Sequence, residues 1–149
     1  MLTAADANGK ELWKYEKGAL VSEPAFSTTR NEIAVVMYDL LFVRLDATTG
    51  KVKWTAPSTG RGAFRGVFAY ENGFLVVVDM GGYRDHENPR VPDSLEYWGD
   101  SDKDFWSIDF PQRAELLVDG KKLYTLFRNQ DELLLKEVHV PRPHRSDSK

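Results

Sequence analysis

The chain has 149 residues, of which 42% are hydrophobic and 29% charged, and its formal net charge is −3 at pH 7. This is the composition of one globular domain, and the negative charge argues against non-specific nucleic-acid binding. The absence of cysteine excludes disulfides, thiolate metal sites and cysteine nucleophiles. The longest apolar runs, Ile33–Met37 and Phe74–Val78, are too short to span a membrane, and we expect no signal peptide because the N-terminus lacks a basic start and an apolar core.

Two stretches near the N-terminus share one pattern, an Asp, then Gly-Lys, then a Trp three residues after the Lys. The pattern comprises Asp6, Gly9 and Trp13 in the first stretch, and Asp46, Gly50 and Trp54 in the second. The two glycines lie 41 residues apart, as do the two tryptophans. A period of ~40–45 residues is the size of one four-stranded blade of a β-propeller, so we expect repeats of this kind.

The predicted elements begin with a single strand, Glu11–Tyr15, followed by four strands, A to D, that make up the first full repeat. These four strands are Ala25–Ser27, Ile33–Tyr38, Leu41–Leu45 and Lys51–Trp54. The near-continuous apolar run of strand B suits a strand buried on both faces. In strand D we expect Val52 and Trp54 to point inward and the lysines outward. No helical period is found, and the predicted class is all-β.

The second repeat is less regular. Its strands A and B are predicted as a hairpin, Val67–Tyr70 and Phe74–Val78, joined by an Asn-Gly turn. Strand C is predicted to end at Ile108-Asp109, by analogy with Leu45-Asp46 in the first repeat, which leaves about 22 residues more than one period. We therefore expect residues 81–103 to form a surface insertion without strands. Strand D is expected to be degenerate and to lack a Trp.

A last unit contains three predicted strands, A to C, at Glu115–Val118, Lys122–Phe127 and Leu133–Val138. We expect residues 141–149 to form a flexible tail, because they are polar and contain prolines. Residues 1–140 are therefore predicted to form about three blades' worth of antiparallel strands, which is a partial β-propeller.

The two copies of the motif resemble the repeat of the quinoprotein-like (PQQ-repeat) β-propellers, Ala-x-Asp-x-x-Thr-Gly-x-x-x-Trp, over roughly residues 1–80. In that family the Trp of each motif packs against the turn of the neighbouring blade. The resemblance implies that Trp13 and Trp54 are packing residues and bind no cofactor. The family includes quinone-dependent dehydrogenases, the lipoprotein of outer-membrane barrel assembly and bacterial sensor domains. Its members are mostly extracytoplasmic, which implies a periplasmic or extracytoplasmic location.

The dehydrogenases of this family need a complete ring that holds the quinone PQQ, a calcium ion and a catalytic Asp. Too few strands are predicted here for a ring of about 4–8 blades. We therefore expect no catalytic residue and no bound PQQ. The predicted function is a non-enzymatic binding or scaffold module with an unknown protein partner. The alternative is one part of a quinone-dependent dehydrogenase whose other blades lie elsewhere.

Three alternating carboxylates, Asp100, Asp102 and Asp104, form the best local constellation for a metal ion. Carboxylates in this spacing present hard oxygen ligands to Ca²⁺, so a calcium-dependent binding module is a third hypothesis. Phe105 and Pro111 stand where a calcium loop has its turn glycine and its bidentate Glu. A solvated acidic loop is the competing interpretation.

Large aromatic side chains lie in or beside the predicted insertion, together with arginine. These residues are Tyr83, Arg84, Tyr97, Trp98 and Trp106. Aromatic and arginine side chains are enriched at the cores of protein interfaces, so this group is a candidate interface. The alternative is that the aromatic rings fold back over the blade.

The strand order also predicts how chains assemble. Propellers close their ring by pairing an N-terminal strand with the C-terminal blade, and Glu11–Tyr15 is the strand that the last unit lacks. Closure within one chain would give three blades, below the usual minimum of about four. Two chains that exchange these strands would form one larger ring without exposed edges. We therefore expect a head-to-tail homodimer if this is the whole protein, and an aggregation-prone or loosely closed monomer if it is a fragment.

Overall fold

The computed structural model describes residues 1–38, 41–57, 62–80, 92–100, 104–112, 114–129 and 132–140. These residues form thirteen strands and no helix, so the predicted all-β class is confirmed. The strands are β1 (Leu2–Ala5), β2 (Glu11–Tyr15), β3 (Ala25–Ser27), β4 (Glu32–Val36), β5 (Leu41–Asp46), β6 (Val52–Pro57), β7 (Ala63–Tyr70), β8 (Gly73–Asp79), β9 (Asp93–Trp98), β10 (Phe105–Phe110), β11 (Glu115–Asp119), β12 (Lys122–Asn129) and β13 (Glu132–Glu137).

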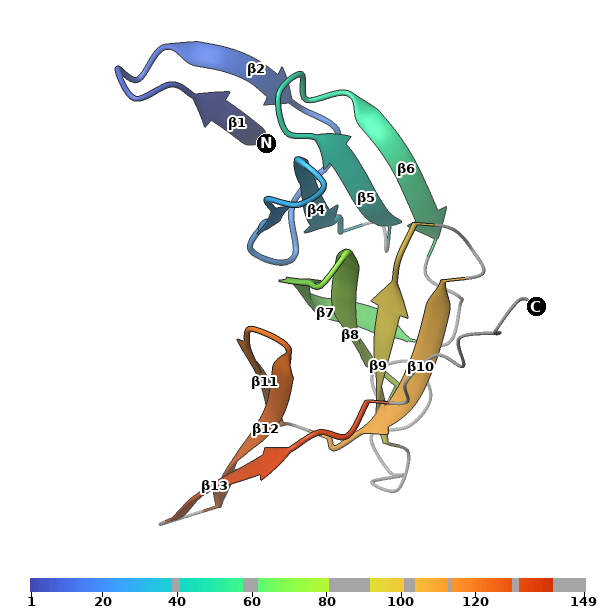
Figure 1. The fold of residues 1–149 in the computed structure, drawn as a ribbon. Helices are drawn as coiled ribbons and strands as arrows, with labels where there is room; N and C mark the ends of the chain where they lie inside the picture. Colours follow the sequence, from blue (N-terminus) through green and yellow to red (C-terminus); the bar gives the residue numbers. More distant parts are fainter. Residues whose placement is uncertain are drawn as a thin grey trace, which may run out of the picture.

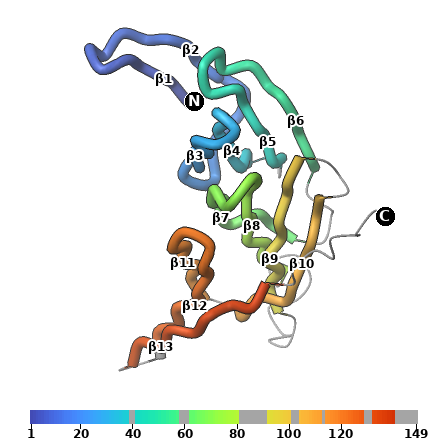
Figure 2. The backbone as a smooth tube through the Cα atoms, in the orientation of Figure 1, coloured from blue at the N-terminus to red at the C-terminus, as the bar shows by residue number. Residues whose placement is uncertain are grey.

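The strands pair antiparallel in four sheets that follow the order of the chain. The sheets are β1–β2, β3–β6, β7–β10 and β11–β13, and each strand pairs with its neighbour in sequence. Figure 1 shows the sheets following one another along a curved stack, with β1–β2 at one end and β11–β13 at the other. The backbone trace in Figure 2 follows the same arc. The first strands, β7 and β11, lie on one side of the arc, and the last strands, β6 and β10, lie on the other.

Hydrophobic cores lie between consecutive sheets. In β4, Val35 packs toward β1–β2 and Val36 toward β7–β10, because neighbouring side chains of a strand point to opposite faces. In β8, Val76 packs toward β3–β6 and Leu75 toward β11–β13. The expected burial of strand B on both faces is confirmed, although Tyr38 at its end is exposed. The two four-stranded sheets are thus covered on both faces.

Strand β6 departs from the predicted alternation. Val52 is exposed and Trp54 half-buried, although both were expected to point inward. The pairing register shifts between Arg44 and Leu45, so that Arg44 lies opposite Trp54 and Leu45 opposite Val52. Lys53 is left as the extra residue of a β-bulge, and a bulge breaks the regular alternation of side chains.

The strand assignment in the second repeat was wrong. Strand C is β9, which lies inside the segment 81–103 that was expected to contain no strand. Ile108-Asp109, expected to end strand C, lies instead in strand D (β10) of a complete four-stranded sheet. Residues 81–91 lie outside the described residues. The extra length therefore falls between β8 and β9.

The polar composition of β9 explains this error. Asp93 and Glu96 are both buried, and they interrupt the apolar pattern that identifies a core strand. Arg65 on β7 forms an ion pair with the Asp93 carboxylate, and the Trp98 indole N–H donates to the Glu96 carboxylate at 3.1 Å. Partners of this kind make burial of a carboxylate tolerable, but the Arg65 partner is distant in the sequence.

The two ends of the chain also differ from each other. At the N-terminus, β2 was expected to be a lone strand, but it pairs with β1 and forms a hairpin in which Leu2 lies opposite Tyr15. At the other end, β11–β13 form a three-stranded sheet, as predicted. The predicted flexible tail, residues 141–149, lies outside the described residues.

Candidate functional site

The two copies of the repeat motif fold into similar turns. The Asp6 carboxylate accepts hydrogen bonds from the backbone N–H groups of Asn8 and Lys10, at 2.8 and 2.9 Å. In the second copy, the Asp46 carboxylate accepts from the backbone N–H and the hydroxyl of Thr49, at 2.8 and 2.9 Å. These contacts lower the pKa of the Asp46 carboxyl below its ordinary value. Asp in both copies therefore holds the turn between strands and does not face a ligand site.

Trp13 connects the N-terminal hairpin to the next sheet. Its indole N–H donates to the Ala47 carbonyl at 2.8 Å, across the junction between the sheets. Its ring lies on Gly50, where a Cβ atom would come within 2.6 Å of the ring. Gly50 has a φ of 67°, a left-handed conformation that glycine adopts without strain. Trp13 thus packs on the neighbouring turn, as the family resemblance implies.

Trp54 lies on β6 and Trp106 on β10, which are the fourth strands of the two four-stranded sheets. Trp54 lies among aromatic rings, with its centroid 5.3 Å from that of Trp98 and 5.8 Å from that of Phe42. Trp106 stacks on Tyr97, with centroids 5.5 Å apart and planes at 11°, and it packs toward β11–β13. The sequence analysis missed Trp106 as a third strand-D tryptophan, because its spacing from Trp54 is longer than one period.

The described aromatic residues of the candidate interface are largely buried. Tyr97 is buried, and Trp98 and Trp106 are half-buried between sheets, so these rings fold over the blade rather than facing solvent. Burial raises the pKa of the Tyr97 phenol to about 12. Tyr83 and Arg84 lie outside the described residues.

Glu32, which the sequence analysis did not single out, is the centre of a buried charge cluster. The Glu32 carboxylate is 1% exposed and accepts from Arg44 Nε at 2.8 Å and Nη2 at 2.6 Å. Lys53 Nζ lies 2.7 Å from the other carboxylate oxygen, and Arg30 Nε donates at 3.1 Å. Burial opposes ionisation, but the bonds from Arg30, Lys53 and Arg44 outweigh it and lower the pKa of Glu32 to about 2.

The same cluster fastens one four-stranded sheet to the next. Arg30 donates to the Asn72 carbonyl at 2.8 Å and forms an ion pair with Asp100, both beyond the junction. Arg44 donates to the Gly99 carbonyl at 2.7 Å. A cavity of about 290 Å³ opens over these groups, lined by charges of both signs that already satisfy one another. We therefore assign the cluster a structural role.

The proposed calcium ligands do not converge among the described residues. Asp100 pairs with Arg30, and its backbone N–H donates to the Asp104 carboxylate at 3.3 Å. Asp102 lies outside the described residues. Within the part of the chain that the structure describes, no group of three metal-binding side chains lies together.

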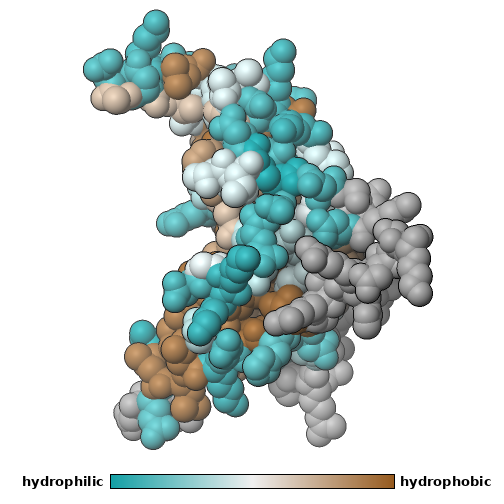
Figure 3. Space-filling model, in the orientation of Figure 1, coloured by the Kyte–Doolittle hydropathy of each residue, from teal (hydrophilic) through white to brown (hydrophobic). Residues whose placement is uncertain are grey.

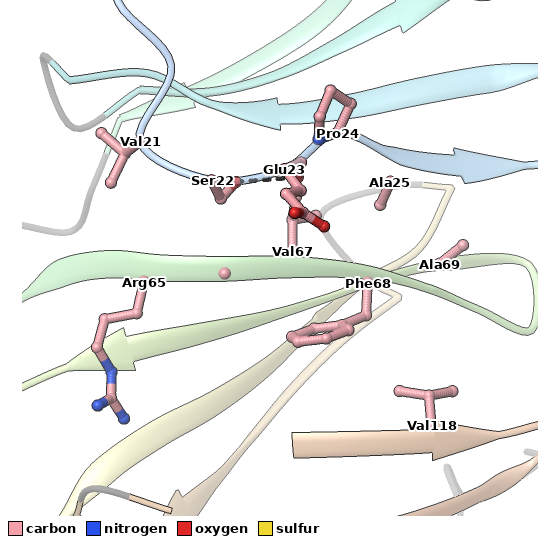
Figure 4. Close-up of a pocket in the computed structure, with 11 residues that line it drawn as sticks. Val21, Ser22, Glu23, Pro24, Ala25, Arg65, Val67, Phe68, Ala69 and Val118 are labelled. Carbon is pink, nitrogen blue, oxygen red and sulfur yellow. Dashed lines mark hydrogen bonds between the residues drawn. The ribbon is translucent and has the colours of Figure 1, made fainter. Parts of the chain in front are cut away.

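A larger cavity, of about 660 Å³, lies between β3, β7 and β11, on the side of the arc formed by the first strands. Figure 4 shows Phe68 extending from β7 on the side of β11, with Val118 pointing back toward it. Glu23 contributes a carboxylate to one wall. Arg65 lies at the end of the cavity, but its guanidinium is paired with Asp93. This cavity is an open groove whose polar groups do not converge on one point.

The last sheet presents an open apolar face. One face of β11 and β12 packs on β7–β10. The other face of the sheet carries Leu117, Tyr124, Leu126, Leu133 and Leu135, which we call the leucine face. Leu117, Leu133 and Leu135 are 42%, 63% and 57% exposed. Figure 3 shows hydrophobic residues gathered over this end of the molecule. The leucine face is the candidate functional site.

The edge of this sheet is open as well. β13 pairs with β12, and among the described residues no strand pairs with its other edge. All six residues of β13 are exposed. In the two four-stranded sheets, by contrast, the third strand is paired on both edges. The position next to β13 corresponds to that of the fourth strand in those two sheets.

Comparison with known proteins identifies the architecture. No protein-family model matches the sequence, and no curated protein matches it either. Among solved structures, the chain resembles the β-propeller BamB from Moraxella catarrhalis, with a TM-score of 0.59 over 79% of this chain. The chain is a partial β-propeller.

The likeness extends to the fold alone, because the sequence identity is 12%. The chain covers 34% of the length of that solved chain, so it spans about a third of it. The four sheets are propeller blades, or parts of blades, in the order expected from the repeat. Membership of the quinoprotein-like family stays a prediction. The described residues contain no helix of a length and apolarity that would cross a membrane.

Proposed function

We propose that the chain is a non-enzymatic module that binds another polypeptide through the leucine face of its last blade. The observation that carries this proposal is the open face itself, with Leu117, Leu133 and Leu135 in solvent although they lie on one side of a single sheet. Contiguous exposed apolar surface marks interaction sites in soluble proteins. The two four-stranded blades have hydrophobic cores against both faces, and their exposed apolar residues Phe26, Val52 and Phe105 lie on separate strands.

The energetics favour a protein partner. Moving one leucine side chain from water into an apolar environment contributes about 1.5–3 kcal/mol. Leu117, Leu133 and Leu135, together with the half-buried Tyr124 and Leu126, form a band across all three strands. A partner that covers this band gains several such contributions from a preformed surface. A flat sheet face of this size fits another polypeptide better than a small molecule.

The test compares capture by three forms of the chain. The wild type, the double variant Leu133→Lys/Leu135→Lys and the control Leu12→Lys are immobilised and exposed to an extract of the source cells. Leu12 is as exposed as these leucines but lies on β2, away from the leucine face. We expect a partner, identified by mass spectrometry, that the wild type and the control retain and the double variant loses. Retention of the same proteins by all three forms would refute the proposal.

A second measurement addresses the enzymatic alternative. The chain is mixed with PQQ and Ca²⁺, and reduction of an electron-accepting dye is followed with alcohol and sugar substrates. The proposal expects no turnover above the rate without protein. Saturable turnover would overturn it in favour of a quinone-dependent dehydrogenase fragment.

A further inference from the structure

We infer that the last blade binds its partner by strand addition, in which an extended segment, apolar at its centre and basic at its ends, pairs with β13 in the position of strand D. No strand of the part of the chain that the structure describes occupies this position, which we call the vacant position. This inference rests on the proposed function and specifies the mode of binding and the chemistry of the partner segment.

The complete blades define the vacant position. In β3–β6 and β7–β10, the fourth strand pairs antiparallel with the third, as β6 does with β5 and β10 with β9. The last blade repeats this order as far as its third strand, β13. A strand that pairs antiparallel with β13 would therefore restore the arrangement that the same chain builds twice.

The backbone of β13 offers hydrogen bonds on its open edge. Just beyond β13, the Val138 N–H donates to the Leu123 carbonyl of the neighbouring strand at 2.8 Å. In an antiparallel pair, successive residues direct their N–H and C=O groups alternately toward the partner strand and away from it. Leu134 and Lys136 therefore bond toward β12, whereas Leu133 and Leu135 direct their backbone groups toward the open edge, as Glu137 does.

Side chains on both sides of the vacant position are apolar. Leu133 and Leu135 lie beside it on the leucine face. On the opposite face of β13, Leu134 is 44% exposed. An added strand would thus meet apolar groups on both faces, which requires apolar residues at its centre.

The charges of β13 determine the ends of the partner segment. Glu132 and Glu137 are the first and last residues of β13, and both are exposed. Opposite charges that face each other across two strands stabilise the pair, and like charges destabilise it. A segment with Lys or Arg near both ends therefore fits this edge, and one with acidic ends does not.

The probe is a fluorescein-labelled peptide, Lys-Thr-Val-Ile-Val-Thr-Lys, whose binding is measured by fluorescence polarisation. We expect saturable binding to the wild type and to Leu12→Lys, and at least tenfold weaker binding to Leu135→Lys. N-methylation of alternate peptide bonds, which removes the donors facing β13, is expected to weaken binding at least tenfold with unchanged side chains. Replacing both terminal lysines by glutamate is expected to weaken it as well. Thermal melting verifies that each variant is folded.

Two results would overturn strand addition. One is the absence of saturable peptide binding, and the other is equal binding of the parent and the N-methylated peptide. If either occurs while the capture experiment still depends on Leu133 and Leu135, the proposed function stands and only its mode is refuted. A wild-type dimer in sedimentation that Leu135→Lys dissociates would mean that a second copy occupies the edge, and this too refutes the inferred partner.

Discussion

Glu32 shows how a single residue can hold two blades together. Its buried carboxylate pairs with Arg44, Arg30 and Lys53, and both arginines also donate to backbone carbonyls of the next blade. Removal of this carboxylate would leave the buried Arg44 guanidinium without its counter-charge, which is costly in the low dielectric of the interior. The cluster could not be predicted from the sequence, since two of its three cations come from other strands and the near-continuous apolar run that follows Glu32 indicated only an apolar core.

The first prediction concerns this carboxylate. At neutral pH we expect Glu32→Gln to lower the free energy of unfolding by about 3–5 kcal/mol, as when a buried ion pair is broken. The control Glu16→Gln removes an exposed carboxylate that forms a surface pair with Lys14, and we expect it to cost less than ~1 kcal/mol. Urea denaturation measures both. Equal effects of the two substitutions would contradict the structural role of the cluster.

The pH dependence of this loss has a definite sign. The pKa of Glu32 in the folded chain is about 2, below its ordinary value of 4.5. Its contribution is therefore present above pH 4.5 and lost as the pH falls toward 2, which amounts to about 3 kcal/mol over this range. We expect the wild-type stability to decrease more steeply than that of Glu32→Gln between pH 5 and pH 2. Parallel curves for the two chains would refute this assignment.

The pH dependence of stability that we expect from Glu96 is opposite in sign to that from Glu32. Burial raises the pKa of its carboxyl, although the bond from the Trp98 indole partly offsets this. A raised pKa in the folded chain means that the contribution of the Glu96 carboxyl to stability is largest at low pH and is lost as the pH rises through the folded value. A Gln at this position can still accept from Trp98 and carries no charge. We expect Glu96→Gln to melt at a higher temperature than the wild type at pH 7, with no such advantage at pH 4.

At the scale of elements, the regular first blade was predictable and the second was not. Strands β3–β6 match their expected positions because alternating apolar residues and the Gly50 turn are local signals. Strand β9 was missed because the buried Asp93 and Glu96 interrupt its apolar pattern, and a pattern interrupted in this way is typical of a polar loop. Strand β1 was missed because Leu2–Ala5 is short and half exposed, and its pairing with β2 supplies what its sequence lacks.

The pairing of β2 with β1 bears on the predicted homodimer. The prediction assumed that β2 is a lone strand ready to complete another chain's last blade, but β2 already pairs with β1. The hairpin would bring two strands to a blade that lacks one. The head-to-tail homodimer stays a prediction, and its simple one-strand exchange does not fit the observed pairing.

The contact between Trp13 and Gly50 gives a prediction with an internal control. Gly9 and Gly50 both have positive φ, of 80° and 67°, so an alanine is strained at either position. A Cβ at Gly9 would meet nothing within 4 Å, whereas at Gly50 it would overlap the Trp13 ring. We expect Gly9→Ala to cost about 1–2 kcal/mol and Gly50→Ala to cost more.

A double-mutant cycle tests the origin of this difference. Trp13→Ala alone is expected to cost about 3–5 kcal/mol, as for other large buried side chains. In that background, the added cost of Gly50→Ala is expected to fall to that of Gly9→Ala, because the ring it would overlap is gone. An unchanged cost would show that strain in the turn, and not the neighbouring blade, makes glycine necessary at this position.

Across the whole molecule, the extent to which neighbouring sheets cover the faces of a sheet decreases from the middle of the stack to its ends. The sheets β3–β6 and β7–β10 are covered on both faces, β11–β13 on one, and the edge of β13 is unpaired among the described residues. Local opening requires least free energy where few apolar contacts and few hydrogen bonds are broken. We therefore expect amide hydrogen exchange to be slowest in β4 and β8 and fastest in β13.

Within β13 the exchange pattern is expected to alternate. The N–H groups of Leu133 and Leu135 face the open edge and should exchange at rates close to those of an unfolded chain, whereas those of Leu134 and Lys136 bond toward β12 and should exchange more slowly. Addition of the strand peptide should protect Leu133 and Leu135 and leave the amides of β4 unchanged. The measurement is made at a concentration where sedimentation shows a monomer. Protection of Leu133 and Leu135 in that monomer without peptide would mean that the edge is already paired, and the last blade would then have no vacant position to fill.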